Sequence, residues 1–147
     1  MASDEFVYVT YIATEPRTLW RALLEAEFTR RYWGHENVSD WTPGSPWEHR
    51  RDDSAHTVVL VGQVVESVPP RRLVLTWAEP ADKTHPERHS RVTFEIEPLA
   101  EMVRLTVTHE RLDPEMRRKV AAGWPRVLSS LKSLLETGRP LPTWAGH

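Results

Sequence analysis

The spacing of apolar residues changes once along this chain, and that change constrains the fold more than any other feature. Val92, Phe94 and Ile96 alternate with polar residues, as expected for a strand with one buried face. From Met116 to Leu135 the apolar residues instead recur at steps of three and four, which predicts a helix with one apolar side. A sheet with one apolar face needs a cover, and this helix is the only long one that the pattern offers.

The same helix carries its own boundary signals. Asp113 and Pro114 are a typical cap and first-turn proline, and Gly138 is a typical end. Pro125 lies inside the apolar stripe, where a proline removes one backbone hydrogen bond and costs about 3 kcal/mol. Because Gly123 makes bending easier, we predict a kink or break at this point, which would divide the helix into a two-part lid with an entrance at the bend.

Six strands are expected before this helix. They cover residues 6–12, 47–51, 57–68, 73–77, 92–97 and 103–108. Gly62 inside the third strand indicates a bulge or a sharp bend, and Pro98–Glu101 links the last two strands into a hairpin. One or two short helices follow the first strand, the first capped by Thr14 and ending near Glu27, the second ending at Trp33. The prediction is an α+β fold in which a curved antiparallel sheet is covered by a long C-terminal helix.

Composition excludes several functional classes. The chain contains no cysteine, which excludes a disulfide scaffold, a thiolate zinc site and a cysteine nucleophile. The net charge is −2 with both signs mixed along the chain, so we expect no nucleic-acid binding. The longest apolar run, Val58–Val61, is far too short for membrane insertion, and the acidic N-terminus lacks the order of a signal peptide. We therefore expect a cytoplasmic protein.

The length of the chain matches one ordinary domain. We expect a single domain over residues 1–147, with its core at about 6–138 and a C-terminal tail at 139–147. Trp144 in this tail is expected to pack back onto the domain, and a contact between chains is the alternative.

A series of short motifs extends from Phe6 to Pro142. They are Pro16-x-x-Leu19-Trp20-x-Ala22-Leu23, Arg31-Tyr32-Trp33-Gly34, Gly62-x-Val64-x-Glu66-x-x-Pro69-Pro70-x-Arg72-Leu73-x-x-x-Trp77, Val92-Thr93-Phe94-Glu95-Ile96, Leu105-Thr106-Val107-Thr108-His109, and Gly123-Trp124 with Leu128-x-x-Leu131. In this order they resemble the activator-of-heat-shock-protein-90-ATPase-like family of the START/Bet v 1-like superfamily.

This resemblance implies a helix-grip fold, in which a curved antiparallel sheet grips a long C-terminal helix around a cavity. It implies less about function, because the superfamily includes lipid carriers, cyclases, hormone receptors and co-chaperone domains. Many relatives carry a Gly-Gly-Thr-type turn between the last two strands. This chain reads Pro98-Leu99-Ala100-Glu101-Met102 there, which predicts a different hairpin turn.

Aromatic residues dominate the candidate cavity. Trp77 shares an alternating face with Leu73 and Leu75, and Trp124 lies on the helix stripe, so both are expected to face one apolar space. A fully packed core is the alternative, because tryptophan buries a large area. The candidate cavity residues are Trp33, Trp47, Leu75, Trp77, Phe94, Leu105, Val107, His109, Met116, Val120, Trp124 and Leu128.

His109 is the candidate catalytic residue. It continues the apolar face of Val103–Val107 if the alternation holds, and a histidine beside an apolar cavity is suited to act as an acid or base near neutral pH. Glu110 or Arg104 would assist it. A histidine that caps the core through backbone hydrogen bonds is the commoner arrangement, so a binding protein is favoured over an enzyme.

Three functions remain open. The leading one is binding of a small apolar or amphipathic molecule between the sheet and the helix. The second is a cofactor-independent cyclase, dehydratase or hydrolase that uses His109. The third is a protein–protein module, resembling the co-chaperone members, or a homodimer. No cofactor or metal site is predicted, because His85 and His89 flank Pro86 in a polar loop without a third ligand.

Overall fold

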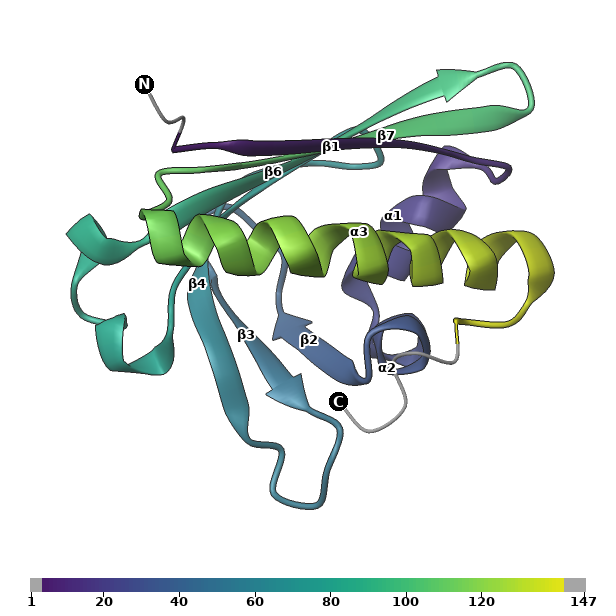
Figure 1. Cartoon of the computed structure of the whole chain (residues 1–147). Helices are drawn as coiled ribbons and strands as arrows, with labels where there is room; N and C mark the ends of the chain where they lie inside the picture. The colour runs from purple at the N-terminus through teal and green to yellow at the C-terminus, as the bar shows by residue number, and fades with distance from the viewer. Residues whose placement is uncertain (1–3, 142–147) are drawn as a thin grey trace.

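The structure is a computed structural model that describes residues 4–141. Within this range seven strands form one antiparallel sheet, in the order β1-β7-β6-β5-β4-β3-β2. The elements are β1 (Phe6–Ile12), α1 (Pro16–Leu24), α2 (Ala26–Tyr32), β2 (His35–Ser39), β3 (Pro46–Arg51), β4 (Val58–Val68), β5 (Arg72–Trp77), the short 3-10 helices η1 (Pro80–Asp82) and η2 (Pro86–Arg88), β6 (Ser90–Leu99), β7 (Met102–Glu110) and α3 (Pro114–Thr137). This architecture confirms the predicted helix-grip fold (Figure 1). Trp144, expected to pack back onto the domain, lies outside the described residues.

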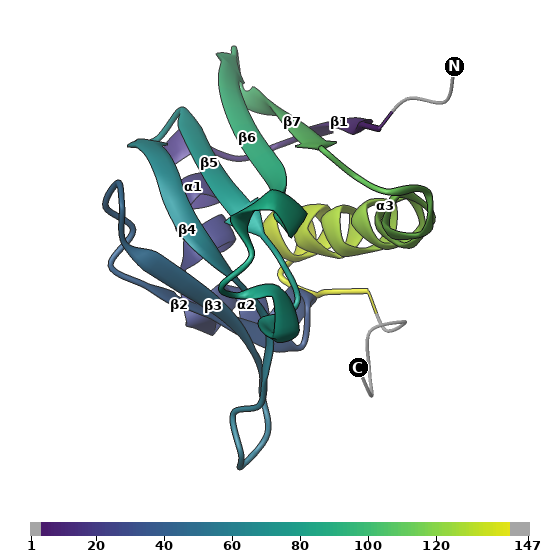
Figure 2. The ribbon, with the colours of Figure 1, turned by 90° about the vertical axis from the view of Figure 1, so that its left-hand side faces the viewer.

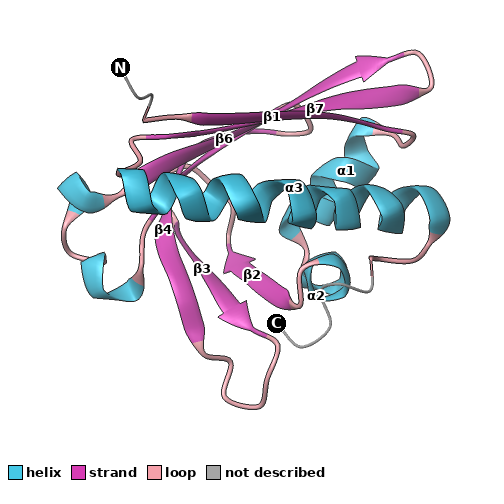
Figure 3. Cartoon of the chain, in the orientation of Figure 1, coloured by secondary structure: helices cyan, strands magenta, loops and turns pink. Residues whose placement is uncertain are grey.

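The sheet curves around α3, which passes along its concave side (Figures 1 and 3). Alternation decides which strand residues face the helix: Leu73, Leu75 and Trp77 on β5 are all buried. The apolar stripe of α3 meets them from the other side, where Trp124 and Leu128 are buried. Burial of each such side chain stabilises the fold by about 1.5–3 kcal/mol.

The start and the end of α3 lie where the sequence predicts them. The Asp113 carboxylate accepts a hydrogen bond from the Met116 backbone nitrogen at 2.8 Å, and Gly138 ends the helix with a φ of 83°. A break at this point is wrong, because α3 continues as one helix through Gly123 and Pro125, whereas a kink there stays a prediction. Buried residues on both sides of Pro125 hold the helix together, so burial outweighs the lost backbone hydrogen bond.

The sheet has one strand more than predicted. β2 was missed because His35, Asn37 and Ser39, which alternate along it, are polar and give no strand signal. The short helices also differ in detail: α1 ends at Leu24, and its cap is Glu15 instead of Thr14. The loop that joins β5 to β6 contains η1 and η2, where the sequence predicts an irregular exposed loop.

The hairpin of β6 and β7 is confirmed and is tighter than predicted. Pro98 and Leu99 still pair with β7, so only Ala100 and Glu101 make the turn, and Ala100 adopts a φ of 50°. The bulge predicted at Gly62 is wrong, because the register of β4 against β5 shifts further along, between Val64 and Glu66. A sharp bend at Gly62 stays a prediction.

Gly62 instead makes room for the Trp47 side chain. The regular pairing of β4 with β5 stops short of Gly62, and the Trp47 indole nitrogen donates a hydrogen bond to the Thr76 carbonyl oxygen at 2.8 Å. A Cβ at Gly62 would lie 1.9 Å from that oxygen and 2.4 Å from the indole nitrogen. The glycine therefore allows the indole to satisfy a backbone carbonyl beside a gap in the ladder.

The edge strand β1 is partly covered by α3. Lys132 and Arg117 on the helix donate hydrogen bonds to the carbonyl oxygens of Tyr11 and Glu5, near the two ends of the strand. These contacts hold the helix along the edge of the sheet. No helix within residues 4–141 is long and apolar enough to cross a membrane.

We expect Gly62→Ala to lower the free energy of unfolding by roughly 3 kcal/mol, because the added methyl group displaces the indole and leaves the Thr76 carbonyl without its partner. Gly123→Ala is the matched control. A Cβ at Gly123 meets no atom within 4 Å, so this change should stabilise the helix by about 0.5–1 kcal/mol. Urea unfolding measures both, and equal effects of the two substitutions would contradict this account of Gly62.

Candidate functional site

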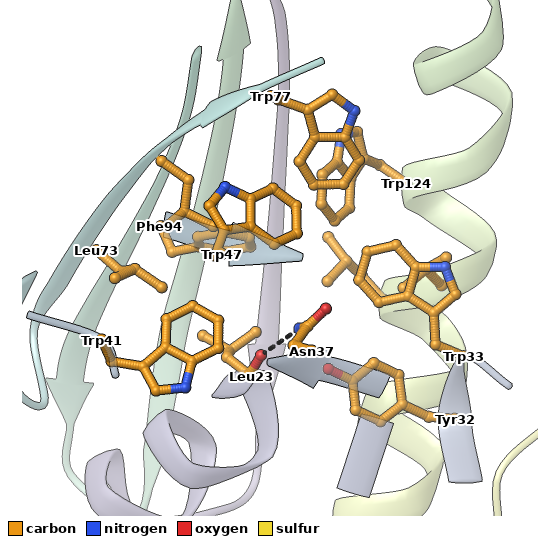
Figure 4. Close-up of a pocket in the computed structure, with 13 residues that line it drawn as sticks. Leu23, Tyr32, Trp33, Asn37, Trp41, Trp47, Leu73, Trp77, Phe94 and Trp124 are labelled. Atoms are coloured by element: carbon orange, nitrogen blue, oxygen red, sulfur yellow. Dashed lines mark hydrogen bonds between the residues drawn. The ribbon is translucent and has the colours of Figure 1, made fainter. Parts of the chain in front are cut away.

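Four tryptophans from different elements meet between the sheet and α3 (Figure 4). Trp77 lies at the centre: its ring centroid is 5.3 Å from that of Trp47 and 5.5 Å from that of Trp124. Trp33, which follows α2, stacks on Trp77 at 6.3 Å. These tilted and stacked contacts are favourable ring geometries. We call Trp33, Trp47, Trp77 and Trp124 the tryptophan cluster.

The tryptophan cluster leaves almost no free space in the interior. The central space measures about 10 Å³, which is close to the least that one water molecule requires. Its lining residues are Leu23, Tyr32, Trp33, Asn37, Trp41, Trp47, Leu73, Leu75, Trp77, Phe94, Trp124, Val127 and Leu128. The sheet and the helix therefore enclose a packed aromatic core and no open cavity among the described residues.

A larger space of about 160 Å³ lies against the same cluster on the α3 side. Gly123 opens it, because this position has no side chain and nothing stands within 4 Å of where a Cβ would be. We call this space the Gly123 pocket. It is lined by Trp33, Trp77, Lys119, Val120, Gly123, Trp124 and Val127.

A chain of hydrogen bonds ties the cluster to His109, which is fully buried. The Trp124 indole nitrogen donates to His109 Nδ1 at 3.1 Å. An indole can only donate, so Nδ1 accepts and the ring proton of the neutral imidazole is on Nε2. Nε2 donates to the Ser90 hydroxyl at 2.8 Å, and this hydroxyl donates to the Trp77 carbonyl oxygen at 3.0 Å. Both ring nitrogens are therefore engaged within the protein.

Burial keeps this histidine neutral. Loss of hydration lowers the pKa of His109 to about 4. Protonation would place a hydrogen on Nδ1 that faces the indole N–H, so the network offers no acceptor for the added proton of the charged ring. The ring serves as a structural link between β7 and α3.

A second buried histidine faces the cluster from β3. His49 Nδ1 lies 2.6 Å from the Asn37 side-chain oxygen, and the Asn37 amide donates to the Leu23 carbonyl oxygen at 3.1 Å, near the end of α1. Burial, with His35 close by, lowers the pKa of His49 to about 3. Its ring centroid is 4.3 Å from that of Trp33. Sequence reasoning missed this pair because β2 was not recognised.

Comparison with known sequences identifies the family of this chain. Residues 13–136 match the sequence profile of the family described as Activator of Hsp90 ATPase homolog 1-like protein. The chain belongs to this family. The match confirms the resemblance drawn from the sequence motifs. No curated protein sequence matches the chain.

Solved structures share the fold of this family member. The Bordetella parapertussis protein encoded by gene BPP1335 is 26% identical, with a TM-score of 0.75 over 98% of this chain and 81% of that chain. CalU16 from Micromonospora echinospora is 19% identical, with a TM-score of 0.75 over 95% and 78% of the two chains. The Aha1 dimer from Colwellia psychrerythraea is 17% identical, with a TM-score of 0.75 over 91% and 97%. At identities of 19% and 17%, the last two structures show a shared fold and nothing further about this chain.

The structure of this chain places seven of the twelve candidate cavity residues around the central space. They are Trp33, Trp47, Leu75, Trp77, Phe94, Trp124 and Leu128. Val120 lines the Gly123 pocket, whereas Met116 lines a separate polar depression near the start of α3. Leu105 and Val107 are buried in the core beside His109.

The structure does not bring Glu110 and Arg104 to His109. Strand alternation points both side chains to the opposite face of β7, where Arg104 pairs with Glu97. The predicted acid–base assistance is therefore wrong. Arg104 and Glu110 are each an odd number of residues from His109, and such a spacing along a strand places side chains on opposite faces. Within residues 4–141 no group of three or more His, Cys, Asp or Glu side chains is placed to hold a metal ion.

The buried histidines predict a pH-dependent stability. Their folded pKa values lie below the unfolded value of about 6.5, so the unfolded chain takes up protons first and stability is lost as pH falls. Between pH 7 and pH 5 each histidine should account for a loss of about 2 kcal/mol. Urea unfolding of His109→Gln should show about 2 kcal/mol less loss over this interval than the parent protein.

The matched control is His85→Gln, which changes an exposed loop histidine. Its loss of stability between pH 7 and pH 5 should equal that of the parent. A His109→Gln protein with the parent's pH dependence would contradict the neutral, buried state assigned to this ring.

Proposed function

We propose that this protein binds a small apolar or amphipathic molecule at the Gly123 pocket, against the tryptophan cluster. One observation carries the proposal: a concave apolar space lies directly on three clustered indole rings, beside a helix position without a side chain. Aromatic walls with few polar groups are typical of small-molecule sites. A flat apolar ligand would stack on Trp33 and Trp77 and lie against α3.

Trp33 controls how deep such a ligand reaches. It lines both the Gly123 pocket and the central space, and its side chain is only half-buried. The Gly123 pocket is smaller than the roughly 300–1,000 Å³ of typical small-molecule sites. A ligand larger than a two-ring compound would have to displace Trp33 and enter the space between α2, β5 and α3.

Lys119 supports an amphipathic ligand. It is the one charged residue among the described residues that line the Gly123 pocket, and its ammonium group lies 3.7 Å from the exposed carboxylate of Glu115. Such a solvent-exposed pair is weak. The ammonium group is therefore available to a polar end of a ligand whose apolar part covers the indoles.

The arrangement of titratable groups favours binding over catalysis. Tyr32 is the only titratable side chain among the described residues that line the central space, and burial raises its pKa. His109 uses both ring nitrogens inside the protein. General acid–base catalysis requires a group that exchanges protons with a substrate, and neither residue is placed to do so.

We expect 1-naphthol, a neutral two-ring probe, to quench tryptophan fluorescence in a saturable way. Gly123→Phe should weaken its binding at least about tenfold, because the new ring fills the pocket. Gly123→Ala is the matched control and should bind the probe within about threefold of the parent. Equal binding by Gly123→Phe and the parent, with both folded by circular dichroism, would refute the proposal.

Self-association through the outer face of β1 is a second candidate, favoured by a specific observation. Val7, Val9 and Tyr11 are 48%, 46% and 47% exposed and lie on one face of this edge strand. A row of exposed apolar side chains is a typical contact surface. The solved Aha1 structure from Colwellia psychrerythraea is described as a dimer.

If β1 mediates a dimer, light scattering should give twice the monomer mass, and Val9→Lys should return the mass to that of the monomer because a charge is costly in an apolar contact. Val38→Lys is the matched control, since Val38 is similarly exposed on β2 at the other edge of the sheet. A parent protein that stays monomeric at millimolar concentration would eliminate this candidate.

A further inference from the structure

A separate pocket lies under the loop that joins β5 to β6. It measures about 310 Å³, at the lower end of the roughly 300–1,000 Å³ range of small-molecule sites. Its floor is made by Glu48, Val61, Gln63 and Thr76, which alternate with inward-facing residues and so point away from the helix. The loop from β5 to β6 covers it through Lys83, Pro86 and His89. Figure 2 faces this end of the molecule.

The cations of this pocket have no internal partners. The side chains of Lys83 and Arg111 both line it, and neither makes an ion pair or a hydrogen bond with any residue from 4 to 141. The only carboxylate in the described lining, that of Glu48, is already held by Arg50 at 2.6 Å. The pocket therefore presents two unpaired positive charges and one neutralised acid.

The rest of the lining combines apolar surface with polar groups. Val61, Pro46 and Pro86 supply apolar contacts. Gln63 contributes an amide, while His89 has one ring nitrogen bound to the Asp82 carbonyl oxygen at 2.8 Å and the other without a partner among the described residues. Such a lining suits a compact molecule with an apolar body and one anionic group.

Arg111 is held in an unfavourable backbone conformation. Its φ is 63°, a region that costs a residue with a Cβ roughly 1–2 kcal/mol and that glycine adopts freely. It lies in the short link between β7 and α3, where glycine would serve the turn better. Strain at a position that carries a charged side chain into a pocket is a pattern found at functional sites.

We propose that this pocket is a second binding site, specific for a small organic anion such as an aromatic carboxylate. Its carboxylate pairs with Arg111 and Lys83, because guanidinium and ammonium groups make strong charge-assisted hydrogen bonds to carboxylates. Its apolar body lies on Val61 and between Pro46 and Pro86. The site is independent of the Gly123 pocket, since the two share no lining residue among those described.

The test uses benzoate as the anionic probe and benzamide as its neutral counterpart. In nitrogen-15 NMR titrations of the full chain, benzoate should shift the backbone amides of Gln63, Thr76 and Lys83 in a saturable way, and benzamide should bind at least about tenfold more weakly. Saturation of the same amides by benzamide with equal affinity would overturn the charge-based proposal, as would the absence of any saturable shift with benzoate.

Two substitutions separate binding from folding. Arg111→Gly removes the guanidinium and relieves the strained φ, so it should weaken benzoate binding roughly tenfold while the melting temperature stays equal or rises. Lys83→Ala should weaken binding to a similar degree. Arg17→Ala, which removes an exposed cation on α1, should leave benzoate binding unchanged. Parent-like affinity in Arg111→Gly would overturn the proposal.

Gly123→Phe distinguishes this site from the aromatic one. It should weaken 1-naphthol binding at least about tenfold and leave the benzoate titration unchanged, because the two pockets share no lining residue among those described. Loss of benzoate binding in Gly123→Phe would place the anion in the Gly123 pocket and would overturn the second site.

Discussion

The hydrogen bond from the Trp124 indole to His109 holds the two layers of this fold in one alignment. It joins α3 to β7 inside an apolar core, where an indole N–H without a partner would cost about 1–3 kcal/mol and where both polar groups are buried. Ser90 and the Trp77 carbonyl complete the chain, so each donor finds an acceptor. Because only one rotation of α3 places the indole over the imidazole, this bond fixes which helix face meets the tryptophan cluster.

The same constraint explains why the buried histidines are engaged within the protein. His109 on β7 and His49 on β3 face the tryptophan cluster from strands on either side of β5, and burial keeps both imidazoles neutral at physiological pH. Their hydrogen bonds run to neighbouring protein groups. The chain belongs to the Activator of Hsp90 ATPase homolog 1-like family, and side chains fill the central space of its fold.

The two sides of the sheet are chemically different as a result. The concave side carries the tryptophan cluster, and Gly123 leaves a gap in the helix surface beside it. The convex side carries ion pairs such as those of Arg72 with Glu66 and Glu95. In the pocket covered by the β5–β6 loop, the side chains of Lys83 and Arg111 have no partner among the described residues, and Arg111 carries a strained φ.

The sequence by itself determined the fold and the inward faces, because the apolar period is a local property that a strand or a helix imposes on its own residues. Trp77 and Trp124 were assigned to one space in this way, and alternation alone separates Arg104 from His109. Tertiary structure decided the rest. β2 is a strand because its polar residues find partners on β3 and at the end of α1. The helix α3 is unbroken because burial on both sides of Pro125 outweighs one lost hydrogen bond. The space between the layers is closed because four indoles from distant segments fit together. Packing of this kind depends on the shapes of side chains far apart in the chain, which no local pattern encodes.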